Sequence, residues 1–218
     1  MDDLTVKCYY YSMKRKFIVF EGIDGSGTST LAVMLQDLFI RHNLKSVLTS
    51  EPTIGPIGSM IRQILFERVF VSKEQKKREQ VLAHLFAADR TDHLYNDKDG
   101  IIQHLENGAH VICTRYTLSS YAYHSFSDDF QKTHDLNKNF PEPDILFYLD
   151  CPVECAMERI SKTRIADINE NRENLERVKE NYEAAIKKYD IKCIRLNAAN
   201  TPEQVFSEVV KHVSTQVD

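Results

Sequence analysis

A glycine-rich segment directly after an apolar run is the feature that most constrains the fold of this chain. Phe17–Phe20 is a continuous apolar run, typical of a strand buried on both faces of a parallel sheet. After the glycines, Leu31, Leu35 and Leu38 recur on one face of a helix. This strand–loop–helix order predicts an α/β fold with the loop at the carboxyl end of the strand. The loop reads Gly22-Ile23-Asp24-Gly25-Ser26-Gly27-Thr28-Ser29-Thr30.

The spacing of this loop predicts a site for nucleotide phosphates. It matches the pattern G-x-x-x-x-G-K-[ST], in which backbone N–H groups and the start of a helix surround phosphate. Ser29 occupies the position whose hydroxyl holds Mg²⁺. Thr28 occupies the position of the lysine that normally neutralises the β- and γ-phosphates. We therefore expect binding of ATP and Mg²⁺ by a loop that lacks its cation.

The rest of the chain alternates between strand-like and helix-like patterns. This alternation predicts a doubly wound, five-stranded parallel sheet with helices on both faces. Ligands of such sheets bind beyond the carboxyl ends of the strands, where Glu21, Glu51, Thr114, Arg115 and Asp150 would gather with the loop. Further strands are expected at 46–49, 111–113, 145–149 and 191–196, helices at 61–66, 75–95, 171–189 and after a capping box at 201–204, and a loop around Pro52, Gly55, Pro56 and Gly58.

Length and charge narrow the class of protein. The 218 residues suit one domain, which we place at 13–218, with Met1–Ser12 as a loose extension and Met13 as the hypothetical start. The net charge of −4 argues against a nucleic-acid binder, and the chain has no apolar run of the roughly 18 residues that span a bilayer. The five cysteines form no zinc or disulfide pattern, which predicts a reducing, cytoplasmic environment.

Motifs beyond the loop resemble those of one enzyme family. Ser50-Glu51-Pro52-Thr53 precedes Gly55–Gly58, Leu85–Arg90 reads LFAADR, Thr114-Arg115-Tyr116 precedes Ser119-Ser120-Tyr121-Ala122-Tyr123, and Leu149-Asp150 precedes Glu158-Arg159-Ile160. Together with FIVFEGIDGSGTST at the loop, they resemble the thymidylate kinases, which are P-loop nucleoside monophosphate kinases. The resemblance runs from Lys16 to about Ile194 and implies a P-loop kinase fold with a short helical lid at about 159–172.

The resemblance also implies a reaction and roles for individual residues. The family transfers the γ-phosphoryl group of ATP to thymidine monophosphate (dTMP), with Mg²⁺, to give dTDP for dTTP synthesis. By resemblance, Phe86 stacks on thymine, Arg115 grips the acceptor phosphate, and Arg90 binds either the base or that phosphate. Tyr123 disfavours a 2′-hydroxyl, and Asp24 accepts from the 3′-hydroxyl. The remaining residues implied are Glu51, Pro52, Ser119 and Ser120 around dTMP and Arg159 on ATP.

Three positions depart from the family pattern: Thr28 replaces lysine, Thr114 replaces aspartate, and Ser50 replaces an arginine. Phosphoryl transfer depends mainly on positioning and electrostatic stabilisation, so the lost charges matter. Our hypothesis is that Lys162 or Arg164 of the lid swings over the γ-phosphate. The carboxylate that orients Mg²⁺ is left open among Asp24, Glu21 and Asp150.

Thymidylate kinase is thus the leading prediction, with dTMP and ATP as small-molecule partners. One alternative is a kinase of another deoxynucleotide or of a nucleoside. A second is a nucleotide-binding homologue that is catalytically weak or inactive, which the changes at Thr28 and Thr114 favour. The resemblance further implies a homodimer, packed through the helices that follow the first and third strands.

Overall fold

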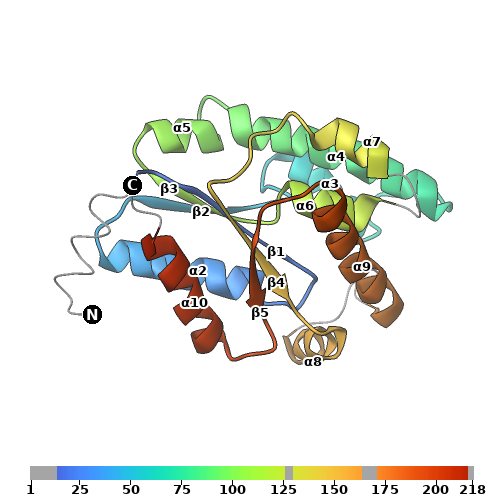
Figure 1. Ribbon diagram of the computed structural model, residues 1–218. Helices are drawn as coiled ribbons and strands as arrows, with labels where there is room; N and C mark the ends of the chain where they lie inside the picture. The colour runs from blue at the N-terminus through green and yellow to red at the C-terminus, as the bar shows by residue number, and fades with distance from the viewer. Residues whose placement is uncertain (1–13, 126–129, 164–170, 216–218) are drawn as a thin grey trace.

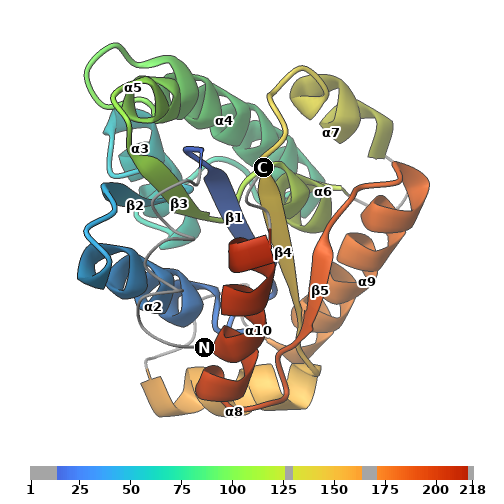
Figure 2. The ribbon, with the colours of Figure 1, turned by 60° about the vertical axis from the view of Figure 1, so that its left-hand side comes forward.

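The computed structural model describes residues 14–125, 130–163 and 171–215. Five parallel strands form one sheet in the order β2-β3-β1-β4-β5, which confirms the predicted architecture (Figure 2). The strands are β1 (Phe17–Gly22), β2 (Ser46–Ser50), β3 (His110–Thr114), β4 (Ile145–Asp150) and β5 (Ile194–Asn197).

The central position of β1 follows from its sequence. All six residues of this strand are buried, as a strand with neighbours on both edges and helices on both faces requires. Phe20 aligns with Thr114 of β3 on one edge and with Phe147 of β4 on the other. Because all strands run in the same direction, the residues after β1, β2, β3 and β4 meet at one end of the sheet. The predicted phosphate loop lies at that end.

Helices cover both faces of the sheet. Figure 1 shows α2 and α10 on one face, with α4 to α7 and α9 on the other. The helices are α2 (Thr28–Arg41), α3 (Pro56–Leu65), α4 (Gln75–Tyr95), α5 (Ile101–Glu106), α6 (Thr117–His124), α7 (Phe130–Asn137), α8 (Val153–Thr163), α9 (Arg172–Lys188) and α10 (Pro202–Thr215).

Two helix boundaries follow from local capping. The Asn171 side chain accepts from the backbone N–H of Asn174 at the start of α9. At the start of α10, the backbone N–H of Thr201 donates to the side-chain oxygen of Gln204, and the backbone N–H of Gln204 donates to the Thr201 hydroxyl. This reciprocal pair is the predicted capping box.

The structure corrects part of the sequence-based assignment. The expected loop through Pro56 and Gly58 is wrong there, because α3 begins at Pro56, where proline suits the first helical turn. The fifth strand begins at Ile194 rather than at 191. Three helices, α5, α6 and α7, were not predicted: they are short, and α6 is rich in serine and tyrosine, so packing rather than helical propensity stabilises them.

Two predicted segments lie outside the described residues. They are the amino-terminal extension at 1–12 and most of the lid, 164–170. The described parts of the lid are the end of α8 and the start of α9, and the domain and lid boundaries therefore stay predictions. None of the helices within the described ranges combines the length and the apolar character that a bilayer crossing requires.

Gly58 yields a stability prediction. A Cβ at this position would overlap the carbonyl oxygen of Thr53 and lie 2.6 Å from its nitrogen. Because both atoms belong to the backbone, Gly58→Ala should displace α3 from the preceding loop and lower the free energy of unfolding by about 2 kcal/mol. Urea unfolding would measure this loss of stability, and Gln63→Ala, at an exposed position of the same helix, is the control. Equal stability of the two variants would contradict the close packing of α3.

Candidate active site

The loop between β1 and α2 has the backbone shape of an anion cradle. Gly25 and Gly27 have φ angles of 77° and 101°, which side chains other than glycine rarely adopt. Gly27 is the N-cap of α2 and no side chain caps this helix, so its first N–H groups remain available to a ligand. A Cβ on Gly25 would lie 2.5 Å from the Ala156 carbonyl oxygen, so α8 packs directly against the loop.

Thr28 and Ser29 begin α2 at the predicted positions. Thr28 is buried, whereas Ser29 is exposed at the mouth of the loop. The buried hydroxyl of Ser26 has no hydrogen-bond partner among the described residues. The loop therefore offers backbone and hydroxyl groups but no cation of its own.

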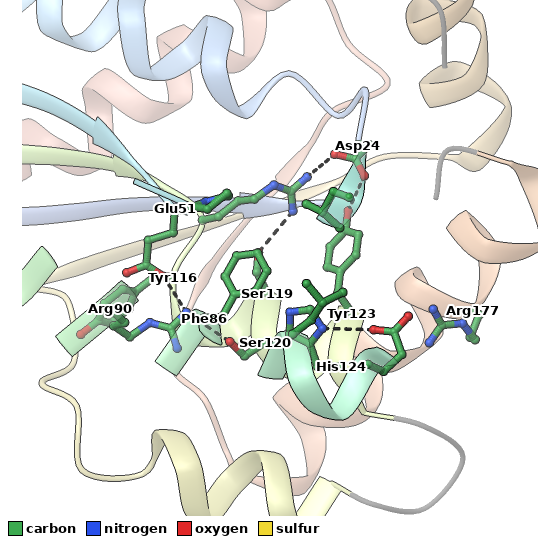
Figure 3. A pocket seen from close by; sticks show the side chains of 15 residues that line it. Asp24, Glu51, Phe86, Arg90, Tyr116, Ser119, Ser120, Tyr123, His124 and Arg177 are labelled. Carbon is green, nitrogen blue, oxygen red and sulfur yellow. Dashed lines mark hydrogen bonds and ion pairs between the residues drawn. The ribbon is translucent and has the colours of Figure 1, made fainter. Parts of the chain in front are cut away.

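Arg115 brings a positive charge to this loop from the end of β3. Its Nη2 donates to the Asp24 Oδ1 at 2.6 Å, and its Nη1 donates to the Gly22 carbonyl oxygen at 3.1 Å. The Tyr123 hydroxyl donates to the Asp24 Oδ2 at 2.9 Å, and Figure 3 shows this pair beside the loop. Burial raises the pKa of Tyr123 well above its ordinary value, so the phenol stays a neutral donor. The three side chains thus form one charge-balanced group next to the cradle.

Glu21 anchors the segment that carries Arg115. Its Oε1 accepts from the backbone N–H groups of Tyr116 and Ser119 at 2.7 and 3.0 Å. Its Oε2 accepts from the hydroxyls of Ser119 and Tyr182 at 2.5 and 3.0 Å. Burial raises the pKa of this carboxyl above its ordinary value. Because four donors already occupy its oxygens, Glu21 is a structural acceptor that joins β1, α6 and α9.

Arg90 of α4 forms a second buried charge group, away from the loop. Its side chain is fully buried, and its Nη2 donates to the Glu51 Oε2 at 2.6 Å and to the Ser120 hydroxyl at 3.1 Å (Figure 3). Its Nη1 donates to the Asn137 side-chain oxygen. The Nε of Arg90 is buried and has no partner among the described residues. The guanidinium group is therefore neutralised and fixed, yet it retains donor capacity.

A cavity of about 190 Å³ lies between the two charge groups. Its wall includes all nine residues that the resemblance assigned to dTMP, so the structure brings this set together: Asp24, Glu51, Pro52, Phe86, Arg90, Arg115, Ser119, Ser120 and Tyr123. Leu65 and Leu82 add an apolar surface beside Phe86. A cavity with one aromatic wall, a few polar groups and a cation at one end suits a small aromatic anion.

Sequence reasoning missed several residues of this cavity. Glu79 and His124 form a buried pair with 3.2 Å between Oε2 and Nδ1, and the His124 ring lies 4.8 Å from that of Phe86. Arg177 of α9 also lines the cavity, and its Nε and Nη2 donate to the side-chain oxygen of Asn174. These residues lie outside the recognised motifs, so the sequence carried no signal for them.

Arg159 reaches the other side of the loop. Its Nη1 lies 3.4 Å from the Ser26 carbonyl oxygen, and its Nη2 donates to the Ala198 carbonyl oxygen at 2.9 Å. A shallow hollow of about 90 Å³ lies here, lined by Ser26, Gly27, Thr30, Leu31, Arg159, Ala198, Asn200, Pro202 and Val205. The predicted ATP residue Arg159 therefore contacts the loop, and the hollow shares no lining residue with the larger cavity.

The two predicted lid cations have different outcomes. Lys162 is exposed on α8 and pairs with Glu158 at 2.6 Å. It does not belong to the wall of either the cavity or the hollow described above. Arg164 lies outside the described residues. Within the described ranges, the cations in contact with the loop are Arg115 and Arg159.

The three carboxylates considered for Mg²⁺ all have partners. Glu21 is saturated by the donors described above, and Asp150 pairs with Lys179 and Arg195 at 2.8 and 2.9 Å. Asp24 is half-buried at the loop and pairs with Arg115. No cluster of three or more metal-ligating His, Cys, Asp or Glu side chains occurs in the described part of the chain. Ser29 and Asp24 are thus the groups at the loop that fit a cation held largely by phosphate oxygens and water.

The fold and this site define a P-loop nucleotide-binding α/β protein. The family model "Thymidylate kinase" matches residues 20–209. A Treponema pallidum (strain Nichols) protein named "Putative thymidylate kinase" is 36% identical over 203 residues, covering 90% of this chain and 94% of that protein. A "Thymidylate kinase" from Leptospira borgpetersenii serovar Hardjo-bovis (strain L550) is 33% identical over 204 residues, covering 89% and 91%. The chain belongs to the thymidylate kinase family.

The Glu21 network predicts the effect of a nearly isosteric change. Glu21→Gln replaces one acceptor oxygen by an amide donor that faces donors, so buried groups lose their partners. We expect the free energy of unfolding at neutral pH to fall by about 2 kcal/mol, as measured by urea unfolding. The exposed Glu106→Gln serves as the matched control. Unchanged stability would contradict the role of Glu21 as an anchor.

The raised pKa of Glu21 adds a pH dependence. A carboxyl whose pKa is higher in the folded than in the unfolded state stabilises the fold in its protonated form. This contribution to stability is complete at pH values below the pKa of the unfolded state, near 4.5, and is lost as the pH rises through the pKa of the folded state. The stability advantage of the wild type over Glu21→Gln should therefore shrink as the pH rises from about 4.5. An advantage that grows with pH would contradict the raised pKa.

Proposed function

We propose that this chain is an active dTMP kinase, which transfers the γ-phosphoryl group of ATP to dTMP. The observation that carries the proposal is the cavity itself. It joins an enclosed, aromatic end at Phe86 and Arg90 to a partly exposed end at Arg115, next to the phosphate loop. A nucleoside monophosphate has the same polarity, with an aromatic base at one end and a phosphate at the other.

This polarity supports a role for Arg90 at the base rather than at the acceptor phosphate. Glu51 already neutralises Arg90, and the rings of Tyr116 and Phe140 lie 5.1 and 5.4 Å from its guanidinium carbon. Because Arg90 and Glu51 are fully enclosed, whereas Arg115 and Asp24 are partly exposed, Arg90 suits a neutral carbonyl better than a dianion. With the sugar toward Tyr123, the edge of thymine farthest from the sugar carries O4. Arg90 is therefore the proposed donor to O4, with Phe86 stacked on the ring and Pro52 and Ser120 completing the base site.

Arg115, Asp24 and Tyr123 form the proposed sugar and phosphate end. Arg115 binds the acceptor phosphate while it stays paired with Asp24, which accepts from the sugar 3′-hydroxyl. The Tyr123 ring, 4.9 Å from the Arg115 guanidinium carbon, closes the cavity where a ribose 2′-hydroxyl would lie. This arrangement supports a deoxynucleotide as acceptor.

ATP and Mg²⁺ belong on the other side of the loop. The backbone N–H groups at Gly25–Thr30 would hold the phosphates, Arg159 would contact the nucleotide, and Ser29 would ligate Mg²⁺ with Asp24 acting through water. Bound Mg²⁺ would neutralise charge that develops on the transferred group. Closure of the lid, with Lys162 or Arg164 moving over the γ-phosphate, stays our hypothesis for the charge that Thr28 does not supply.

A turnover assay tests the proposal directly. With ATP and Mg²⁺, ADP release should depend on dTMP and be much slower with the ribonucleotide UMP, with dCMP or with thymidine. Preference for another acceptor would assign the chain to another deoxynucleotide or nucleoside. Calorimetric binding of ATP and dTMP without turnover at high enzyme concentration would identify a catalytically inactive homologue, the alternative that Thr28 and Thr114 favour.

The proposal includes a homodimer and a cytoplasmic location. The apolar side chains of Val33 and Ile40 on α2 are 46% and 58% exposed, which supports an interface on this helix. The two helices expected at the interface, those after the first and third strands, are α2 and α6. Only α2 supports this expectation, since α6 is largely buried. Sedimentation of the wild type and of Val33→Glu would test the interface.

The free thiols of the described cysteines support the proposed cytoplasmic location, because they suit a reducing compartment.

Phe86 gives a prediction specific to the base. Replacing it by leucine keeps an apolar side chain but removes the aromatic face, and base–aromatic stacking contributes about 1–3 kcal/mol. Phe86→Leu should therefore raise the KM for dTMP about tenfold or more and leave the KM for ATP within about twofold. The exposed Phe66→Leu is the control. Equal increases in both KM values would contradict the placement of the base at Phe86.

A further inference from the structure

A chain of hydrogen bonds runs from strand β2 to Arg90 through a residue outside the cavity. The Thr49 Oγ1 lies 2.7 Å from the His93 Nε2, and the His93 Nδ1 lies 3.2 Å from the Glu51 Oε1. The other oxygen of Glu51 accepts from Arg90 at 2.6 Å. His93, Glu51 and Arg90 are buried, with 7%, 3% and 0% of their surface exposed. The chain is therefore shielded from water at its inner end.

The acceptor role of Glu51 fixes the direction of its bond to His93. Glu51 is an acceptor toward Arg90, so its other oxygen accepts as well and the His93 Nδ1 donates. The Thr49 hydroxyl can both donate and accept, so the His93 Nε2 has a partner there in either role. Each polar side-chain group in the hydrogen-bonded series Thr49, His93 and Glu51 therefore has a complementary partner.

We propose that His93 is a positioning residue for base recognition, acting on Arg90 through Glu51. This inference rests on the proposed function. His93 follows Arg90 by three residues on α4, so the two side chains share a helix face and hold the Glu51 carboxylate between them. His93 and Thr49 line a separate groove beside β2, and His93 is not part of the wall of the substrate cavity. Its effect on substrate therefore passes through Glu51.

The need for this partner follows from the burial of Glu51. Among the described side chains, His93 is the donor to Oε1. Without it, a buried carboxylate oxygen loses its hydrogen bond, and the carboxylate is free to rotate away from Arg90. The guanidinium group would then shift or reorient, and its donors would no longer face O4 of thymine. Affinity for the base should fall, while the loop and Arg115 keep their geometry.

Three substitutions at one position separate this role from simple packing. An asparagine amide can stand in for Nδ1 of histidine, whereas the longer glutamine reaches the position of Nε2. We expect His93→Gln and His93→Phe to raise the KM for dTMP about tenfold, and His93→Asn to keep it within about twofold. The kcat and the KM for ATP should change less than twofold in all three. His84→Phe, on the exposed face of the same helix, is the control.

A base analogue provides the second readout. The 5-methyl-2-pyrimidinone analogue of dTMP lacks O4, so it gives Arg90 no acceptor there. His93→Phe should leave the KM for this analogue unchanged relative to the wild type, because the proposed coupling passes through that acceptor. A purely structural role would penalise both substrates equally.

The outcomes are distinct. The inference is overturned if His93→Gln keeps the wild-type KM for dTMP, if His93→Asn is as impaired as His93→Gln, or if the analogue suffers the same penalty as dTMP. If His93→Phe fails to fold in a thermal melt, the Asn and Gln pair still decides, because both retain a polar amide. A wild-type chain with no dTMP turnover would instead overturn the proposed function on which the inference rests.

Discussion

The buried carboxylate of Glu21 is the interaction on which the site depends. It stands at the end of the central strand and accepts four hydrogen bonds, from the Tyr116 and Ser119 backbone and from the Ser119 and Tyr182 hydroxyls. A charged group with no partners would be costly there, and the four donors offset that cost. The same bonds fix the start of α6 beside the phosphate loop, so one side chain sets where Arg115, Ser119 and Tyr123 lie.

Two departures from the family pattern change opposite charges at the site. Thr28 removes a positive charge and Thr114 removes a negative one, so the net charge of the site is unchanged by the two together. The charges that remain near the loop are paired, with Asp24 on Arg115. Arg115 is thus a cation that the fold holds against both the loop and the cavity, and phosphoryl transfer depends on such placement.

The sequence predicted what depends on local pattern and on recognised motifs. The apolar run at Phe17–Phe20 and its glycine-rich successor predicted the central strand, the loop and the helix after it. The sequence did not reveal the contact between Asn137 and Arg90, which are 47 residues apart, because this contact depends on the unpredicted helix α7. Likewise, nothing in the pattern around His93 indicates a bond to Glu51, which lies 42 residues away. Contacts of this kind arise only when distant elements pack.

In the proposed function, Arg115 grips the acceptor phosphate, and its charge is needed for phosphoryl transfer. The most direct measurement is the single-turnover rate of dTMP phosphorylation at saturating ATP, Mg²⁺ and dTMP, for the wild type, Arg115→Lys and Arg115→Met. Removing a catalytic arginine from such a site costs about 10³-fold or more in rate. The account predicts a loss of that size for Arg115→Met and a smaller loss for Arg115→Lys, which keeps the charge. A wild-type rate for Arg115→Met would contradict it.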